Sequence, residues 1–212
     1  MLIAFEGIDG AGKSTQIQKV AAWFESLGFK TCVTAEPTKG PYGQKIRQAT
    51  QERLPPQVER QLFVDDRKEH LETCITPALE RGEIVITDRY FYSSVAYQGS
   101  RRDAFDHEPT TQELENLQDE IYAENRAFAP EADILIYVKI DVDTALERMK
   151  NNRESLDPFE KKQTLIDVAN AFDRIINKGM NAIAVDGTLP AEQVTAAILA
   201  PLGFLLSNCY GD

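Results

Sequence analysis

Short stretches with strand-like and helix-like hydrophobic patterns alternate along the whole chain. Apolar or β-branched runs predict five strands, at Leu2–Glu6, Thr31–Ala35, Glu83–Thr87, Ala132–Ile140 and Asn181–Val185. Apolar residues at helical spacing predict helices at Ser14–Ser26, Gln57–Arg81, Thr110–Asn125, Val142–Met149, Leu165–Asn177 and Pro190–Leu199. We expect Gly28 to end the first helix as a C-cap, and Pro77 to kink or divide the second.

This alternation predicts an α/β fold in three layers, a five-stranded parallel sheet with helices on both faces. The Ala132–Ile140 run is apolar along most of its length, as expected for a strand covered on both sides. The chain has 212 residues and shows no internal repeat, low-complexity tract or linker. We therefore expect a single domain over residues 1–212.

Composition and charge narrow the possible partners. Hydrophobic residues make up 42% and charged residues 27%, the balance of an ordinary globular protein. With 23 Lys and Arg against 34 Asp and Glu, the formal net charge is −11. Because nucleic-acid affinity depends mainly on neutralising phosphates, such a chain is a poor general binder of DNA or RNA. We expect no nucleic-acid partner, although cations that cluster locally could still hold a small anion.

The N-terminal segment, the lengths of the apolar runs and the cysteines indicate the cellular compartment. The N-terminal segment MLIAFEGIDG is too short and too acidic for a signal peptide. No apolar run approaches the ~20 residues that a membrane helix needs. The three cysteines, Cys32, Cys74 and Cys209, are widely spaced without zinc-site spacing, and we interpret them as small apolar filler in a reducing compartment. We expect a cytoplasmic protein that does not engage a membrane.

The turn after the first predicted strand carries the strongest chemical motif. It reads Gly7-Ile8-Asp9-Gly10-Ala11-Gly12-Lys13-Ser14 and fits G-x-x-x-x-G-K-[ST] at every fixed position, between a strand and a helix. Glycines let backbone N–H groups point inward at phosphate oxygens, and the following helix adds the positive end of its dipole. We expect residues 7–15, through Thr15, to bind the phosphates of ATP, with Lys13 reaching the β- and γ-phosphates and Ser14 ligating Mg²⁺. The fold class is then a P-loop three-layer sandwich.

Other motifs of P-loop proteins are missing. A GTPase would carry N-K-x-D, whereas the nearest string is Asn177-Lys178-Gly179-Met180, and D-x-x-G, whereas the third strand is followed by Asp88-Arg89-Tyr90-Phe91. Motor ATPases usually have larger chains. A small kinase that transfers a γ-phosphoryl group to a small acceptor remains.

An anionic acceptor requires further cations, and arginine suits phosphate because its planar fork binds two oxygens. Arg89 directly follows the third strand, at the sheet edge where open α/β sheets bind ligands. Arg67 lies in the long predicted helix, where a solvated surface charge is an equal alternative. Arg148 and Arg153 belong to a polar stretch, about residues 148–162, that could close as a lid or be a charged surface loop.

Three acidic residues are predicted close to the phosphates. Asp88 would lie beside the phosphate loop and could hold Mg²⁺ directly or through water. Asp9 lies inside the loop, and Glu36 ends the second strand. Phosphate repels a carboxylate unless a metal or a hydroxyl intervenes, so both acids are candidates for the site, and Glu36 also for the metal.

These elements together resemble the bacterial type of the thymidylate kinase family. Four segments carry the resemblance in order: FEGIDGAGKST (5–15), AEPT (35–38), LFVDDRKEH (62–70) with PALERGEIVITDRYFYSSVAYQG (77–99), and the arginine-bearing lid (148–160). The most specific string is DRYFYSSVAYQ, which is similar throughout to the family pattern D-R-Y-x-x-S-x-x-A-Y-Q. The resemblance covers most of residues 1–160, and the last quarter fits by architecture alone.

The resemblance implies ATP as donor, dTMP as acceptor, Mg²⁺ as cofactor and a homodimer. It implies that Arg89 grips the 5′-phosphate of dTMP, that Asp9 lies between sugar and transferring phosphate, and that Arg148 and Arg153 close over the phosphates. The dTMP-binding residues implied are Asp9, Glu36, Phe63, Arg67, Arg89, Ser94, Tyr97 and Gln98. Phe63 would stack on the base, and Tyr97 would crowd the 2′ position; from the residues alone both could be core aromatics. Arg67 would contact the thymine edge or the phosphate region, and Ser94 and Gln98 the base.

Some positions depart from the family pattern. The lid reads Asp157-Pro158-Phe159-Glu160, where the family commonly has an arginine after the Asp, and AEPT is followed by Lys39-Gly40-Pro41 rather than a glycine-rich string. The loop Asp9-Gly10-Ala11 carries no cation, which fits the variant in which the lid supplies the catalytic arginine. Three hypotheses stay open: a dTMP kinase, a kinase for another monophosphate or a nucleoside, and a nucleotide-binding regulator without turnover.

Overall fold

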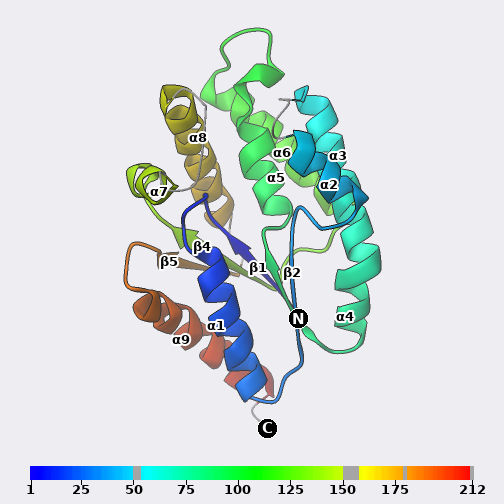
Figure 1. Ribbon diagram of the computed structural model, residues 1–212, viewed down its shortest axis with the longest axis vertical. Helices are drawn as coiled ribbons and strands as arrows, with labels where there is room; N and C mark the ends of the chain where they lie inside the picture. Colours follow the sequence, from blue (N-terminus) through cyan, green and yellow to red (C-terminus); the bar gives the residue numbers. More distant parts are fainter. Residues whose placement is uncertain (50–53, 150–157, 179–180, 211–212) are drawn as a thin grey trace.

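The computed structural model describes residues 1–49, 54–149, 158–178 and 181–210 and contains one parallel β-sheet (Figure 1). Its strands are β1 (Leu2–Glu6), β2 (Thr31–Ala35), β3 (Ile84–Asp88), β4 (Ile134–Lys139) and β5 (Ala182–Asp186). Their order is β2-β3-β1-β4-β5, and all four neighbouring pairs are parallel. The five predicted strands and the α/β class are confirmed, with strand ends differing by up to two residues.

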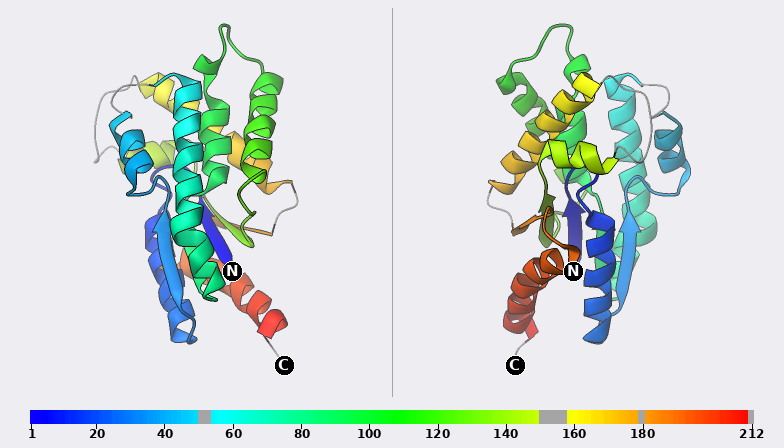
Figure 2. Two further views of the ribbon diagram at one scale, coloured as in Figure 1. Left: turned by 90° about the vertical axis from the view of Figure 1, so that its right-hand side faces the viewer. Right: turned by 60° about the vertical axis from the view of Figure 1, so that its left-hand side comes forward.

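Helices pack on both faces of this sheet (Figure 2). They are α1 (Lys13–Ser26), α2 (Pro41–Ala49), α3 (Pro56–His70), α4 (Thr76–Glu80), α5 (Phe91–Tyr97), α6 (Thr111–Arg126), α7 (Val142–Met149), α8 (Pro158–Ile176) and α9 (Ala191–Tyr210). Helices α1 and α9 contact each other and cover one face, whereas α5 packs between α6 and α8 on the other. β1 and β4 are buried almost throughout because both their faces are covered.

The long predicted helix is interrupted where proline forbids regular hydrogen bonding. Between α3 and α4, residues Leu71–Ile75 form a π-helical turn that ends just before Pro77. Proline has no N–H to bond the carbonyl four residues earlier, and a wider turn accommodates that missing bond. The expected interruption at Pro77 is confirmed, and Gly28 (φ 87°) lies just beyond the end of α1 as predicted.

Several elements differ from the sequence expectation. Helices α2 and α5 were not predicted, because both are short and α5 is buried on nearly all sides and so lacks a polar face. Helix α8 begins at Pro158, inside the stretch expected to form the lid. Helix α9 continues through Pro201 to Tyr210, whereas the predicted helix ended at Leu199. No helix in the described part of the chain combines the length and apolarity needed to cross a membrane.

The topology brings distant loops to one edge of the sheet. All strands are parallel, so the segments after β1, β2 and β3 start from the same edge. β1 lies between β3 and β4, and the chain leaves β1 toward β2 on one side but leaves the adjacent β4 toward β5 on the other, which makes this a topological switch point. The candidate site is built here.

Candidate active site

The phosphate loop joins β1 to α1 in a conformation that needs glycine. Gly7 has φ 143°, and a Cβ added there would lie 2.5 Å from the carbonyl oxygen of Val138. Gly12 has φ 92° and is the N-cap of α1, so the helix begins at Lys13 with its first N–H groups directed at the loop. The backbone therefore forms an anion cradle at the positive end of the α1 dipole.

Lys13 is buried and folds back over this loop. Its Nζ donates hydrogen bonds to the carbonyl oxygens of Gly7 (2.9 Å) and Ile8 (3.2 Å). Burial, together with the nearby charge of Arg89, lowers the pKa of Lys13 to about 8. The charged form of Lys13 is therefore stabilised when an anion enters the cradle, because the anion supplies the opposite charge that is missing in the buried site.

Ser14 and Asp88 meet beside the cradle, where a metal ion was predicted. The Ser14 hydroxyl donates to Asp88 Oδ2 at 3.0 Å. Together with Asp9, Lys13, Glu36 and Arg89 they line a cavity of about 410 Å³. No group of three or more His, Cys, Asp and Glu side chains forms a metal site among the described residues. A hydroxyl and a carboxylate that leave the remaining positions to water and phosphate oxygens nevertheless fit Mg²⁺, which keeps several waters and takes few protein ligands.

Arg89 stands at the junction of β3 and α5 in a left-handed backbone conformation, φ 69°. That conformation is unusual for a side-chain-bearing residue and occurs mostly where the surrounding structure enforces it. One nitrogen, Nη2, donates to Asp9 Oδ1 (2.7 Å) and to the Tyr97 hydroxyl (3.2 Å), and Nη1 donates to Ser93 Oγ (2.9 Å). Although burial opposes the charge, Tyr97, Asp9 and Glu6 hold the pKa of Arg89 above its ordinary value.

A second cavity, of about 350 Å³, adjoins the first. Phe63, Tyr97 and Gln98 line it, together with Asp9, Pro37, Ile46, Arg47, Ala49, Leu54, Glu59, Leu62, Arg89, Ser93, Arg101 and Thr164. Among the residues that the structure describes, Asp9 and Arg89 alone line both cavities. Most of its lining area is apolar, with a few charged groups, which suits a ring with one charged end.

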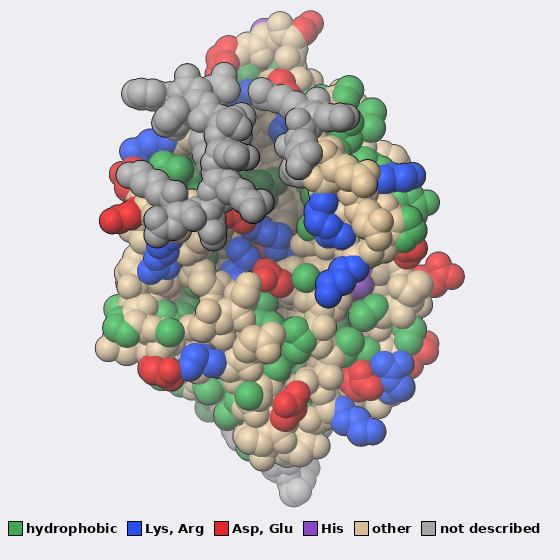
Figure 3. All heavy atoms as spheres, in the orientation of Figure 1, with side chains coloured by type: hydrophobic (Ala, Val, Ile, Leu, Met, Phe, Trp, Pro, Cys, Tyr) green, Lys and Arg blue, Asp and Glu red, His purple; other side chains and the backbone are tan. Residues whose placement is uncertain are grey.

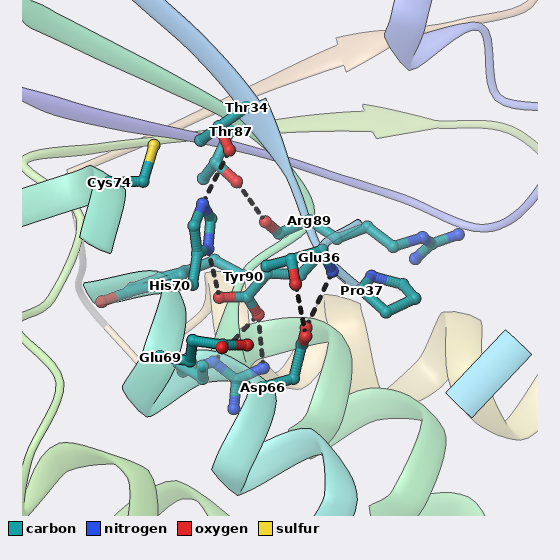
Figure 4. A network of polar contacts seen from close by, with 12 residues as sticks. Thr34, Glu36, Pro37, Asp66, Glu69, His70, Cys74, Thr87, Arg89 and Tyr90 are labelled. Carbon is teal, nitrogen blue, oxygen red and sulfur yellow. Dashed lines mark hydrogen bonds and ion pairs between the residues drawn. The ribbon is translucent and has the colours of Figure 1, made fainter. Parts of the chain in front are cut away.

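Behind these cavities lies a buried polar network, drawn in Figure 4. Glu36, at the end of β2, accepts at Oε2 from Arg67 Nε (2.9 Å) and Nη2 (2.6 Å) and at Oε1 from His70 Nδ1 (3.1 Å). Arg67 also donates to Asn125 Oδ1 (2.5 Å) and Ser94 Oγ (3.1 Å), and it is 1% exposed. The surface-charge interpretation of Arg67 is therefore wrong, because its guanidinium is buried and makes four hydrogen bonds to interior partners.

A buried carboxylate supports Arg89 from the other side. Glu6, at the end of β1, accepts from the backbone N–H groups of Tyr90 and Ser93 and from the Ser93 hydroxyl at 2.6 Å. Burial raises the pKa of Glu6 to about 7 against the opposing effect of Arg89. The sequence analysis did not single out Glu6, since a carboxylate ending a strand gives no signal that it will cap helix α5, whose N-cap Tyr90 is 84 residues away.

The structure brings most of the predicted residues together. Asp88, Arg89, Glu36, Phe63, Tyr97 and Gln98 all line one of the two cavities, as do six of the nine predicted loop residues: Asp9, Gly10, Gly12, Lys13, Ser14 and Thr15. Gly7, Ile8 and Ala11 line neither cavity. Arg67 and Ser94 also line neither; they belong to the buried network, and their contact with a base stays a prediction. Arg148 donates to the carbonyl oxygens of Gly10 and Gly187, both at 3.1 Å, beside the loop. Arg153 and most of the predicted lid lie outside the described residues.

Three charged residues of the second cavity were missed from the sequence: Arg47, Glu59 and Arg101. Arg101 donates to Glu59 Oε2 and to both oxygens of Asp103, and Glu59 Oε1 accepts from Gln98 at 2.9 Å. Arg47 donates to the carbonyl oxygens of Pro37 (3.0 Å) and Thr38 (2.5 Å). Arg47 and Arg101 lie in segments for which no element or motif was predicted, and Glu59 is one of several charged residues on the predicted helix Gln57–Arg81, so no sequence signal pointed to them.

The face of the molecule that carries the loop is hollowed at its centre (Figure 3). Several Lys and Arg side chains gather in and beside this hollow, whereas most acidic side chains on this face lie away from its centre. A local cluster of cations thus exists despite the formal net charge of −11.

Comparison with known proteins agrees with this geometry. The family model described as thymidylate kinase matches residues 5–198. A thymidylate kinase of Xanthomonas euvesicatoria pv. vesicatoria is 36% identical over 211 residues, which cover 98% of this chain and 87% of the relative. A thymidylate kinase of Desulfotalea psychrophila is 41% identical over 177 residues, covering 82% and 81%. Over nearly its whole length, the chain belongs to the thymidylate kinase family.

Proposed function

We propose that the protein transfers the γ-phosphoryl group of ATP to dTMP, giving dTDP and ADP. One observation carries this proposal: the phosphate-loop cavity and the mostly apolar cavity meet at Asp9 and Arg89. A phosphoryl group passes between two substrates only where their phosphates face each other in line. The guanidinium at this junction can hold the acceptor's phosphate, and the loop holds the donor's.

The second cavity accounts for the acceptor. Phe63 stacks on the thymine ring, and Gln98 contacts its polar edge. Tyr97, whose ring lies under the Arg89 guanidinium at 4.9 Å, crowds the 2′ position of the sugar and so favours deoxyribose. Arg67 and Ser94 act from behind this surface, on the base edge or on the groups that contact it. Arg47 and Arg101 add positive charge at the rim.

The first cavity accounts for the donor. Residues 7–15 hold the ATP phosphates through backbone N–H groups, with Lys13 on the β- and γ-phosphates. Ser14 and Asp88 would hold Mg²⁺, which supplies neutralisation of phosphate charge when bound. Glu36 lines this first cavity together with the junction residue Arg89, and both of its carboxylate oxygens already accept hydrogen bonds from Arg67 and His70. We therefore assign Glu36 to the acceptor's sugar at the junction rather than to direct contact with the ion.

Little covalent work is required of the side chains. Catalysis consists of aligning the two phosphates and neutralising the charge that spreads over the transferring oxygens. Lys13 acts from the donor side and Arg89 from the acceptor side. Arg148 already lies beside the phosphate loop. Arg153 approaches when the 148–162 segment closes and excludes water that would otherwise hydrolyse ATP. Asp9 keeps the Arg89 guanidinium aligned between sugar and phosphate.

The cellular location, the oligomeric state and the partners of the enzyme are also part of the proposal. Phosphorylation of a free nucleotide with ATP places the protein in the cytoplasm, where both substrates occur. We also propose a homodimer. No nucleic-acid partner is proposed, since the formal net charge is −11.

An acceptor panel tests the function. ADP release should depend on added dTMP and exceed the rate with dUMP, dCMP, AMP or thymidine when each is assayed with ATP and Mg²⁺. Preference for another monophosphate would support the second hypothesis, and preference for thymidine would show that Arg89 does not bind an acceptor phosphate. ATP binding without acceptor-dependent ADP release would make the protein a regulator without turnover.

A further inference from the structure

Helix α3 and its π-helical continuation are joined to segment 32–38 by a ladder of side-chain contacts. Cys74 meets Cys32 (Sγ–Sγ 3.8 Å), His70 meets Thr34, Arg67 meets Glu36, and Asp66 meets Thr38. From Cys32 to Glu36, two residues of extended chain rise about 6.6 Å and three or four residues of helix about 4.5–6 Å, so the first three rungs stay nearly in step. Asp66, next to Arg67 on the helix, reaches Thr38 beyond the end of the strand. The ladder runs from the half-buried cysteines up to the edge of the candidate site (Figure 4).

His70, like Arg67, contacts Glu36 while lining neither substrate cavity. Its side chain is 2% exposed, and both ring nitrogens have partners. Nδ1 lies 3.1 Å from Glu36 Oε1, and Nε2 lies 2.7 Å from Thr34 Oγ1. It lies one helical turn after Arg67, which holds the other oxygen of the same carboxylate.

The chemistry of these partners determines where the imidazole proton lies. A carboxylate held by an arginine accepts hydrogen bonds and donates none, so His70 Nδ1 must carry hydrogen. The Thr34 hydroxyl can donate or accept and therefore adapts to whatever Nε2 presents. The hydrogen bond to Glu36 thus determines that Nδ1 of the imidazole carries hydrogen, as a neighbouring acceptor commonly does for histidine.

Two donors from one helix prevent the Glu36 carboxylate from rotating. With Arg67 on Oε2 alone, the group could turn about its last bond and carry Oε1 away from the cavity that it lines with Arg89 and the loop. With His70 on Oε1, both oxygens are fixed to α3, which is itself anchored to the same loop through Asp66 and Thr38. A side chain fixed this way is pre-organised for a ligand.

We infer that His70 is a positioning residue of this enzyme, which holds Glu36 through Nδ1–H so that the acceptor's sugar meets a fixed carboxylate. The inference rests on the proposed function, because it assigns Glu36 to the acceptor side. His70 itself contacts no substrate, and its effect passes through one hydrogen bond.

A pair of amide variants separates positioning from packing. In His70→Asn the side-chain amide nitrogen can take the place of Nδ1, and in His70→Gln the place of Nε2. Both substitutions should lower the melting temperature to a similar extent, since each reduces the side-chain volume and loses one of the two hydrogen-bond partners of His70. By calorimetry, His70→Gln should weaken dTMP binding about tenfold with ATP binding unchanged, whereas His70→Asn should stay within about threefold of wild type, in keeping with one hydrogen bond to a charged group.

A spectroscopic measurement tests the same hydrogen bond without activity. The chain has only two histidines, so a His107→Gln variant assigns the ring signals of His70 in a ¹H–¹⁵N spectrum. We expect hydrogen on Nδ1, whether the ring is neutral or charged. A neutral ring protonated at Nε2 alone would overturn the inference, as would equal dTMP affinities for the two amide variants. Wild-type protein that fails to bind dTMP would instead refute the proposed function and the inference with it.

Discussion

The donor side and the acceptor side of this site are built in different ways. The donor cradle is a single contiguous loop whose groups are largely backbone, and Asp9, Gly12, Ser14 and Thr15 are all exposed. The acceptor side draws on β2, α3, α5 and α6, and its polar groups Glu36, Arg67, His70 and Asn125 are buried and bonded to one another. Binding of ATP therefore depends on local backbone conformation, whereas binding of the acceptor depends on the packing of several elements.

The difference arises from what each side recognises. A triphosphate tail is bound by charge and by N–H groups, which any correctly curled loop supplies. A nucleotide with a particular base and sugar requires side chains at defined positions, and these are held only by a rigid interior. We expect donor-side substitutions to affect turnover with little change in stability, and substitutions in the buried network to affect stability first.

The largest effect is expected for Lys13→Ala. Loss of the ammonium that neutralises the transferring phosphate should lower kcat by about 10³-fold or more. The melting temperature should stay within about 4 °C of wild type, since only two hydrogen bonds to loop carbonyls are lost. Steady-state kinetics and calorimetric melting check both values. Ordinary turnover in this variant would refute the donor assignment, and cooperative loss of the fold would remove the contrast between the two sides.

Arg67→Met should have its main effect on stability. It leaves the Glu36 carboxylate buried without its cation, which costs about 3 to 5 kcal/mol and lowers the melting temperature by roughly 6–20 °C. Arg60→Met is the matched control, because Arg60 lies on the same helix and pairs with the more exposed Glu120 and Glu124. We expect Arg60→Met to lower the free energy of unfolding by about 1 kcal/mol or less. Urea unfolding measures both values. Similar losses of unfolding free energy in the two variants would show that burial of the network does not determine its contribution to stability.

A smaller, graded effect is expected with pH. The pKa of Lys13 is about 8, and only its protonated form attracts phosphate. kcat/KM for ATP should therefore be level below pH 8 and fall above it by up to about tenfold per unit. In Lys13→Arg the guanidinium keeps its charge, so the residual activity should not fall in this range. The same decline in both enzymes would assign the titration to another group.

The parts of the fold and site that depend on local pattern were predictable. The strands were recognised because buried parallel strands are continuous apolar runs, and the phosphate loop because its spacing is imposed by phosphate geometry. Helix α5 was missed because burial on nearly every side removes the amphipathic signal. Arg67 looked like a surface charge because its partners, Glu36 and Asn125, are 31 and 58 residues away.

The chain by itself determined a phosphate loop, a parallel sheet and a family, since each depends on residues close together in sequence. Only the tertiary structure decided that two cavities meet at Asp9 and Arg89, and that His70 and Arg67 hold one carboxylate between them. The physical reason is that a buried polar group must be hydrogen-bonded, and its partner is whichever group the packing places beside it. The spacing of residues along the sequence does not show which residue that is.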